Sequence, residues 1–228
     1  MVKRLRGSFS DRRLAVLGAL GVLSGLVVGL VAFRVAYTRS VDNAGLVWNL
    51  FLAWIPLALA LLLYDRHVRR AGLASLGGLG LLWLLFFPNA PYIVTDFKHL
   101  AGSTGEKFWY DGVLIATAAT TGLLLGFVSL YLLQAIVRRG VGARYAWVFV
   151  FFVLGLGSFG VYLGRVLRWN SWDVFVRPGP LTADLAHGLV DPLAHPRPIG
   201  ITFLFTSFLV AGYLLFYSLA RATSLLRD

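Results

Sequence analysis

The chain has 228 residues, of which 58% are hydrophobic and 14% charged, and its mean hydropathy is +0.77, whereas soluble domains usually carry about 25% charged residues. It contains no cysteine, which excludes disulfides, thiolate metal sites and thiol nucleophiles. The net charge of +11 comes from short basic clusters beside apolar runs, with no nucleic-acid-binding motif, so we expect a membrane protein and no nucleic-acid partner.

Six apolar stretches are long enough to cross a bilayer, which takes about 20 mainly apolar residues. We therefore predict an all-α, polytopic transmembrane bundle of about six helices, with short interfacial helices in the outer loops and a single domain over residues 1–228. The first stretch is too long for a signal-peptide core and is interpreted as an uncleaved anchor. The third is short and glycine-rich, which leaves open whether it crosses fully or re-enters. The six spans cover residues 14–33, 46–64, 71–87, 112–134, 145–164 and 199–220.

The positive charges orient this bundle. Of the 21 lysines and arginines, 13 lie in the amino-terminal segment, the loops after the second and fourth spans, and the carboxyl end. The other eight are spread over longer loops on the opposite side, which also hold seven of the ten acidic residues. The positive-inside rule then predicts a multi-pass protein of the cytoplasmic membrane with both termini in the cytoplasm. The loops after the first, third and fifth spans face outward.

Glycines in three spans predict close packing between helices, because small residues allow backbones to approach in lipid. We expect intramolecular packing seams. The alternative is a face for a homo-oligomer or a membrane partner, and the sequence does not separate the two. Membrane lipids are the other expected partner. The glycines are Gly21, Gly25 and Gly29 in the first span, Gly77, Gly78 and Gly80 in the third, and Gly157, Gly160 and Gly164 in the fifth.

The loop after the third span carries the first candidate residues. Residues 87–100 read Phe-Pro-Asn-Ala-Pro-Tyr-Ile-Val-Thr-Asp-Phe-Lys-His-Leu. We expect the two prolines to end the helix and keep the residues between them extended, and Asn89 to bond its own backbone. Asp96 is expected to cap a short following helix, with His99 on the same face. This turn, cap and interfacial helix account for every residue; the functional alternative is that Asp96 and His99 act as an acid/base pair or as two ligands of an incomplete metal site.

A basic, tryptophan-rich turn follows the fifth span. In residues 160–173, Arg165 and Arg168 are three apart, so we expect both to project from one side of the helix end. One interpretation is an interfacial belt, with tryptophans at headgroup depth and arginines reaching to phosphates. The other is that the two guanidinium groups bind a phosphate or carboxylate. Asn170 and Asp173 would then orient them or contribute chemistry.

These two segments also carry a family resemblance. The strings Phe-Pro-Asn-Ala-Pro-Tyr-Ile-Val-Thr-Asp at 87–96 and Tyr-Leu-Gly-Arg-Val-Leu-Arg-Trp-Asn-Ser-Trp-Asp at 162–173 resemble an uncharacterised bacterial integral membrane protein family, domain of unknown function 1361. The resemblance extends over most of the chain from the second span onward. His99 fits the family pattern, whereas Lys98 stands where the family often has an apolar residue. The resemblance adds no activity and names no cofactor, but it implies that these two loops are the family's hallmark.

The outer loop 174–198 is rich in proline and contains two Asp/His pairs. Asp184 and His187 are three residues apart, and Asp191 and His195 are four apart. Divalent metal binding is one interpretation of these pairs. Because they match no known ligand motif, we expect solvated loop residues and predict no metal ligands.

The leading hypothesis is a polar pocket at the outer interface that binds or processes an anionic lipid-linked or cell-envelope substrate. The chain has no phosphate-binding glycine loop, nucleophile elbow, zinc-protease motif or dinucleotide fingerprint, so whether it is an enzyme stays open. The hypothesis requires the two motif segments to lie within about 15 Å of each other. The candidate catalytic residues are Asp96, His99 and Asp173, and the candidate substrate-binding residues are Asn89, Arg165, Arg168 and Asn170.

Two alternatives belong to other classes. A transporter or channel would need a continuous polar path, and no charged residue lies in the middle of any span, where ion-coupled transporters usually carry one. The hydroxyl groups within the spans are instead expected to bond to helix backbones. A non-catalytic membrane partner subunit would use the glycine faces. The path predicted for transport is lined by Thr117, Thr121, Ser158 and Thr206.

Overall fold

The structure, a computed structural model, describes residues 2–101, 104–180, 182 and 196–225. Six helices in this part are long and apolar enough to cross a membrane, which confirms the predicted all-α bundle. Each predicted span coincides with one of them. The six are Arg13–Thr38, Gly45–Val68, Leu73–Leu100, Gly105–Val141, Ala143–Arg165 and Ile199–Ala222.

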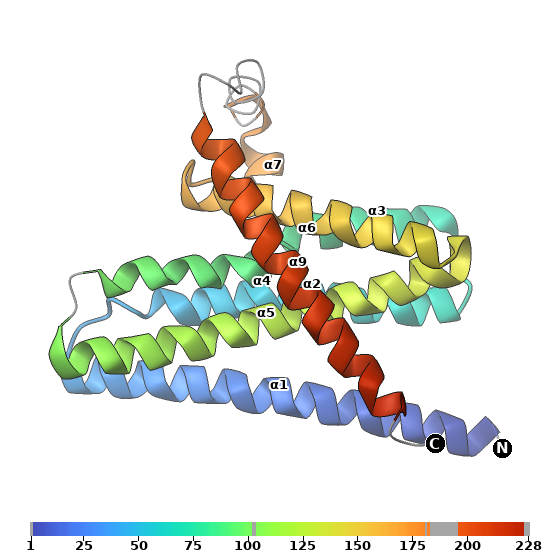
Figure 1. The fold of residues 1–228 in the computed structure, drawn as a ribbon, viewed down its shortest axis with the longest axis horizontal. Coiled ribbons are helices and arrows are strands. Elements are labelled where there is room, and N and C mark those ends of the chain that lie inside the picture. Colours follow the sequence, from blue (N-terminus) through green and yellow to red (C-terminus); the bar gives the residue numbers. More distant parts are fainter. Residues whose placement is uncertain (1, 102–103, 181, 183–195, 226–228) are drawn as a thin grey trace.

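Figure 1 shows the long helices running mostly along one axis, with α9 crossing the others obliquely. The long helix α5 is central, because α1, α2, α6 and the short elements between α3 and α5 all pack against it. The first turns of α1 and the last turns of α9 lie toward the same end of the bundle (Figure 1). The elements are α1 (Val2–Thr38), α2 (Gly45–Val68), α3 (Leu73–Phe86), α4 (Asn89–Tyr92), the 3-10 helix η1 (Ile93–Leu100), α5 (Gly105–Val141), α6 (Ala143–Arg165), α7 (Asp173–Val176) and α9 (Pro196–Leu225).

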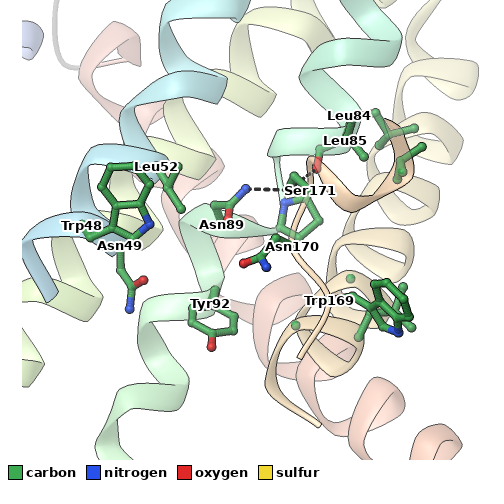
Figure 2. A pocket seen from close by; sticks show the side chains of 15 residues that line it. Trp48, Asn49, Leu52, Leu84, Leu85, Asn89, Tyr92, Trp169, Asn170 and Ser171 are labelled. Atoms are coloured by element: carbon green, nitrogen blue, oxygen red, sulfur yellow. Dashed lines mark hydrogen bonds between the residues drawn. The ribbon is translucent and has the colours of Figure 1, made fainter. Parts of the chain in front are cut away.

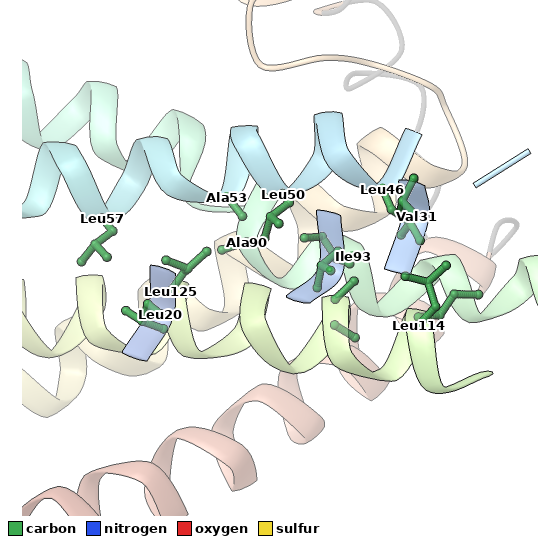
Figure 3. Packing of buried hydrophobic residues seen from close by; sticks show 14 residues of the cluster. Leu20, Val31, Leu46, Leu50, Ala53, Leu57, Ala90, Ile93, Leu114 and Leu125 are labelled. Atoms are coloured by element: carbon green, nitrogen blue, oxygen red, sulfur yellow. The ribbon is translucent and has the colours of Figure 1, made fainter. Parts of the chain in front are cut away.

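Two apolar clusters form the core. The first lies between α1, α2 and α5 and includes Ala90 of α4 and Ile93 of η1, both fully buried (Figure 3). The second joins α3, α5, α6 and α9 around the buried rings of Trp83, Phe87 and Tyr213. Since lipid is as apolar as leucine, it is the close fit of these side chains that holds the helices together.

The chain stays helical through the proline-rich motif, so the predicted extended segment is wrong. Pro88 has φ −58° and ψ −24°, and Asn89–Tyr92 and Ile93–Leu100 are both helical. A proline ring fixes φ near the helical value and suits the first turn of a helix, so each proline can begin a segment. The third span therefore continues to Leu100. Asp96 lies inside η1 and is not a helix cap.

Glycines of α5 and α6 form a cradle for α4 and for the two residues before it, Phe87 and Pro88. A Cβ added at Gly122 of α5 would lie 2.6 Å from the carbonyl oxygen of Ala90, and one added at Gly160 of α6 would lie 2.5 Å from Cγ of Pro88. Such contacts are possible only without a side chain. The glycines of the fifth span therefore form an intramolecular seam, as predicted. The cradle consists of Gly122, Gly126, Gly157, Gly160 and Gly164.

The other two glycine groups are not internal seams, and that expectation is wrong for them. Gly21, Gly25 and Gly29 are exposed on α1, and an added Cβ would meet nothing within 4 Å. The same open space surrounds the glycines of α3. Because α1 packs through its opposite side, its glycine stripe faces away from the bundle. Its use by an oligomer or partner stays a prediction.

A buried polar cluster attaches α1 to the bundle. Arg34 of α1 forms an ion pair with Asp111 of α5, and the Nη2–Oδ2 distance is 2.9 Å. Asn43 donates to the same carboxylate at 3.2 Å, and all three side chains are buried. Arg34 and Asp111 each lie one residue outside the spans predicted from the sequence. Toward the other end of α1, Arg13 forms a partly exposed ion pair with Asp65.

Most of the hydroxyl groups in the spans bond to the backbone of their own helix, as expected, and an exception is Thr202, whose buried hydroxyl has no partner within the described residues. Ser129 donates to the carbonyl of Gly126, and the four hydroxyls of the predicted transport path each donate to a carbonyl four residues earlier. The donors and acceptors are Thr117 to Val113, Thr121 to Thr117, Ser158 to Leu154, and Thr206 to Thr202.

Candidate functional site

An ion pair joins the two motif segments. Arg165, the last residue of α6, donates through Nη2 to Oδ1 of Asp96 in η1. Its Nε donates to the hydroxyl of Thr95, and its Cζ lies 4.5 Å from the ring centroid of Tyr92. Asn49 of α2 donates to Oδ2 of Asp96 at 2.9 Å. Both carboxylate oxygens of Asp96 thus have donors, and the two segments are in direct contact.

His99 lies on the same face of η1 as Asp96, as the spacing predicted. A 3-10 helix brings residues three apart into register. The His99 Nε2 lies 3.7 Å from Oδ1 of Asp96, which is longer than a hydrogen bond, and its side chain is 48% exposed. His99 is therefore an accessible imidazole beside a buried carboxylate.

A second bridge between the motifs is formed by Asn89 and Ser171. The Asn89 Nδ2 donates to the Ser171 hydroxyl at 3.0 Å, as Figure 2 shows, and to the carbonyl of Phe86 at 2.9 Å. Ser171 in turn donates to the carbonyl of Leu85. The amide of Asn89 thus caps the end of α3 and binds the segment after α6, instead of forming the predicted local turn.

Asp173 holds the turn after α6 closed. One of its oxygens accepts the backbone N–H of Asn170 at 2.7 Å and the Asn170 side chain at 3.2 Å, and the other accepts from Arg177 at 3.1 Å. The backbone hydrogen bond from Asn170, helped by Arg177, lowers the pKa of the Asp173 carboxyl. Asp173 therefore stays ionised at neutral pH and organises the loop, with Asn170 as its partner.

Arg168 does not form the expected helical pair with Arg165. Helix α6 ends at Arg165, and Arg168 has φ +62°, a left-handed conformation that takes the chain out of the helix. Its side chain is exposed and forms no ion pair within the described residues. The next residue, Trp169, lines the pocket described below. The two arginines therefore differ: Arg165 is committed to Asp96, and Arg168 is available.

A pocket of about 240 Å³ lies between the two motif segments and α2 (Figure 2). Its lining is apolar in part and polar in part. The apolar lining comes from Leu52, Leu84, Leu85, Pro88, Gly160, Leu163, Gly164 and Val174. The polar and aromatic lining comes from Trp48, Asn49, Asn89, Tyr92, Trp169, Asn170 and Ser171.

The site also contains residues outside the set of candidates predicted from the sequence. Asn49 lies inside an apolar span, where an amide is itself a signal of a polar partner. Tyr92, Thr95 and Ser171 lie within the two motif strings, and only their contacts distinguish them from their neighbours. Trp48 has no sequence signal beyond its place near a span end.

The second set of histidines cannot be compared with this site. Asp184, His187, Asp191 and His195 lie outside the described residues. Within the described part of the chain, no three His, Asp or Glu side chains are grouped so that they could hold a metal ion. Asp96 and His99 therefore form a pair there, without a third ligand.

The six membrane-spanning helices and the pocket at one end of their bundle define a multi-pass helical membrane protein. Residues 48–211 match the family described as "Protein of unknown function (DUF1361)", and the chain belongs to this family. The match includes both motif strings and begins after α1, which confirms the resemblance seen in the sequence. No curated protein and no solved structure matches the chain.

Proposed function

We propose that the chain is a protein of the bacterial inner membrane, with both termini in the cytoplasm. The excess of lysine and arginine at the termini and in the loops after the second and fourth spans supports this orientation. The start of α1 and the end of α9 lie toward one end of the bundle, whereas the last turn of α6 lies toward the opposite end (Figure 1). In this orientation the pocket opens toward the outer surface.

We further propose that the pocket binds an anionic lipid-linked or cell-envelope molecule. The observation that carries this proposal is the mixed lining at the end of a membrane bundle, because leucines suit an acyl or prenyl chain and amides suit a headgroup. Arg168, next to the lining residue Trp169, suits the negative charge, since a guanidinium binds phosphate or carboxylate through two donors. Arg165 positions Asp96 in this scheme.

Processing of the bound molecule would require a group that transfers a proton. His99 is the best candidate, since its imidazole ring is half exposed and an imidazole can both accept and donate a proton. Asp96 and Asp173 have donors on both oxygens, so they act as positioning residues. Binding is therefore the primary role, and chemistry at His99 is secondary.

A membrane partner role is the second candidate, because the glycine stripe of α1 is exposed. Gly21, Gly25 and Gly29 would let a helix of a second copy or another subunit approach closely. A Gly25→Leu variant should then abolish assembly measured by cross-linking in the membrane. Transport has less support, because the hydroxyls of its predicted path donate to their own helices.

Photo-cross-linking in living cells tests the binding proposal. A benzophenone amino acid placed at Val174, which lines the pocket, should capture one discrete anionic lipid-linked species identified by mass spectrometry. The matched control is Phe152, which is 60% exposed on α6 outside the pocket and should capture bulk phospholipids only. Arg168→Ala should weaken capture at Val174. Identical bulk lipids at both positions would contradict the proposal.

A further inference from the structure

The polar part of the pocket carries no charged side chain. None of its 15 lining residues is Asp, Glu, Lys, Arg or His. The charged groups that contact the lining from outside are paired: Asp96 with Arg165 beside Asn49 and Tyr92, and Asp173 with Arg177 beside Asn170 and Trp169. Whatever enters the pocket therefore meets amides, hydroxyls and aromatic rings.

The hydrogen-bonding capacity left over in this lining consists of both acceptors and donors. Asn49 and Asn89 use their amide nitrogens to donate, to Asp96 and to Ser171 and Phe86. Their Oδ1 atoms accept no hydrogen bond within the described residues, and neither is buried without a partner. The Tyr92 hydroxyl, which can donate and accept, also lacks a partner there, and Asn49 keeps one amide N–H.

This mixture of unused donors and acceptors selects the chemistry of the ligand. An ionised phosphate only accepts hydrogen bonds, so it would leave the amide oxygens of Asn49 and Asn89 without a donor. A hydroxyl group both donates and accepts, and it complements an amide that has one free oxygen. Asn49, Asn89, Asn170 and Tyr92 gather around the centre of the pocket in Figure 2, so several hydroxyls could be bound at once.

The aromatic lining points to the same class. Trp48 is 55% exposed, and Trp48, Tyr92 and Trp169 all line the pocket. The negative face of an aromatic ring attracts weakly positive C–H groups, which sugar rings present on their apolar faces. The volume of about 240 Å³ is smaller than the roughly 300–1,000 Å³ of pockets for drug-sized ligands, and it suits a single ring.

We infer that the group in the pocket is a carbohydrate ring, so that the ligand is a glycosylated lipid phosphate. This inference rests on the proposed function, which supplies the lipid chain and the anion. The sugar occupies the neutral pocket between Asn49, Asn89 and Tyr92, and the phosphate lies at the rim near Arg168.

Binding of four probes to the full chain in phosphatidylcholine nanodiscs tests this inference. The probes are dodecanol, dodecyl glucoside, dodecyl phosphate and dodecyl glucosyl phosphate, and the dissociation constant is measured by thermophoresis. We expect dodecyl glucosyl phosphate to bind at least about tenfold tighter than dodecyl phosphate. Tyr92→Phe and Trp48→Leu should remove most of this gain. The control is Trp109→Leu, at a tryptophan that is 73% exposed and lies outside the pocket, and this variant should keep the full gain.

The outcomes distinguish failure of the carbohydrate assignment from failure of the proposed binding of an anionic lipid. Equal dissociation constants for the two phosphates would overturn the carbohydrate assignment and leave the anionic lipid in place. Equal dissociation constants for the glucoside and the glucosyl phosphate would support the carbohydrate but overturn the anionic part of the proposed function. An Arg168→Ala variant that binds the glucosyl phosphate as tightly as the wild type would also overturn the anionic part. Saturable binding of none of the four would overturn the proposed function together with the inference.

Discussion

Arg165 at the end of α6 and Asp96 in η1 are 69 residues apart in the chain and form a hydrogen-bonded ion pair. The carboxylate is buried, and it also accepts a hydrogen bond from Asn49 of α2. Three segments of the chain therefore meet at one side chain. This contact aligns the two motif strings and forms one side of the site.

Breaking the Asp96–Arg165 pair should destabilise the protein strongly. Arg165→Leu leaves a buried carboxylate without its cation, which costs about 3–5 kcal/mol. The double variant Asp96→Asn/Arg165→Leu should be more stable than Arg165→Leu, because no unpaired charge remains. Unfolding in detergent, followed by helical circular dichroism, measures both. A double variant no more stable than Arg165→Leu would show that the unpaired carboxylate is not the cause of the loss.

A single methyl group in the glycine cradle should also destabilise the bundle. Gly122→Ala places a Cβ 2.6 Å from the carbonyl oxygen of Ala90, and such overpacking costs about 1–3 kcal/mol. Gly112→Ala is the control in the same helix, where nothing lies within 4 Å. It should be neutral or stabilising by up to about 1 kcal/mol, since alanine favours helix. Equal melting temperatures for the two variants would show that α4 is not held by α5.

The proposed orientation can be measured directly, because the chain has no cysteine. Single cysteines at Lys98 and Arg168, both exposed, should react with an impermeant maleimide added outside intact inner-membrane vesicles of native orientation. Cysteines at Arg69 and Arg139, also exposed, should react only after the membrane is permeabilised. Labelling of Lys98→Cys and Arg168→Cys from different sides would refute a common outer pocket.

The loop after α6 should lose stability only in acid. Because the Asn170 backbone N–H lowers the folded pKa of Asp173, its contribution to stability is complete above the ordinary carboxyl pKa of about 4. It is lost as the pH falls through the lower folded pKa. The difference in melting temperature between the wild type and Asp173→Ala should therefore be constant from pH 7 to about pH 5 and shrink toward pH 3. A difference that grows in acid would show that the carboxyl is protonated in the folded protein.

The number and approximate limits of the spans were determined by the sequence alone, because hydropathy is a local property that adds along the chain. The same holds for the backbone bonding of Thr117 and Ser158, whose acceptors lie one turn away. The nearness of Asp96 and His99 on one face also follows from short spacing.

Only the tertiary structure decided which distant groups meet. The pairing of Asp96 with Arg165, and of Arg34 with Asp111, depends on how separate helices pack, which no local pattern encodes. For the same reason, similar glycine spacing led to opposite results, with Gly160 packed closely against Pro88 and Gly25 exposed with nothing near it. A glycine permits close approach, but the neighbouring helix determines whether that approach occurs.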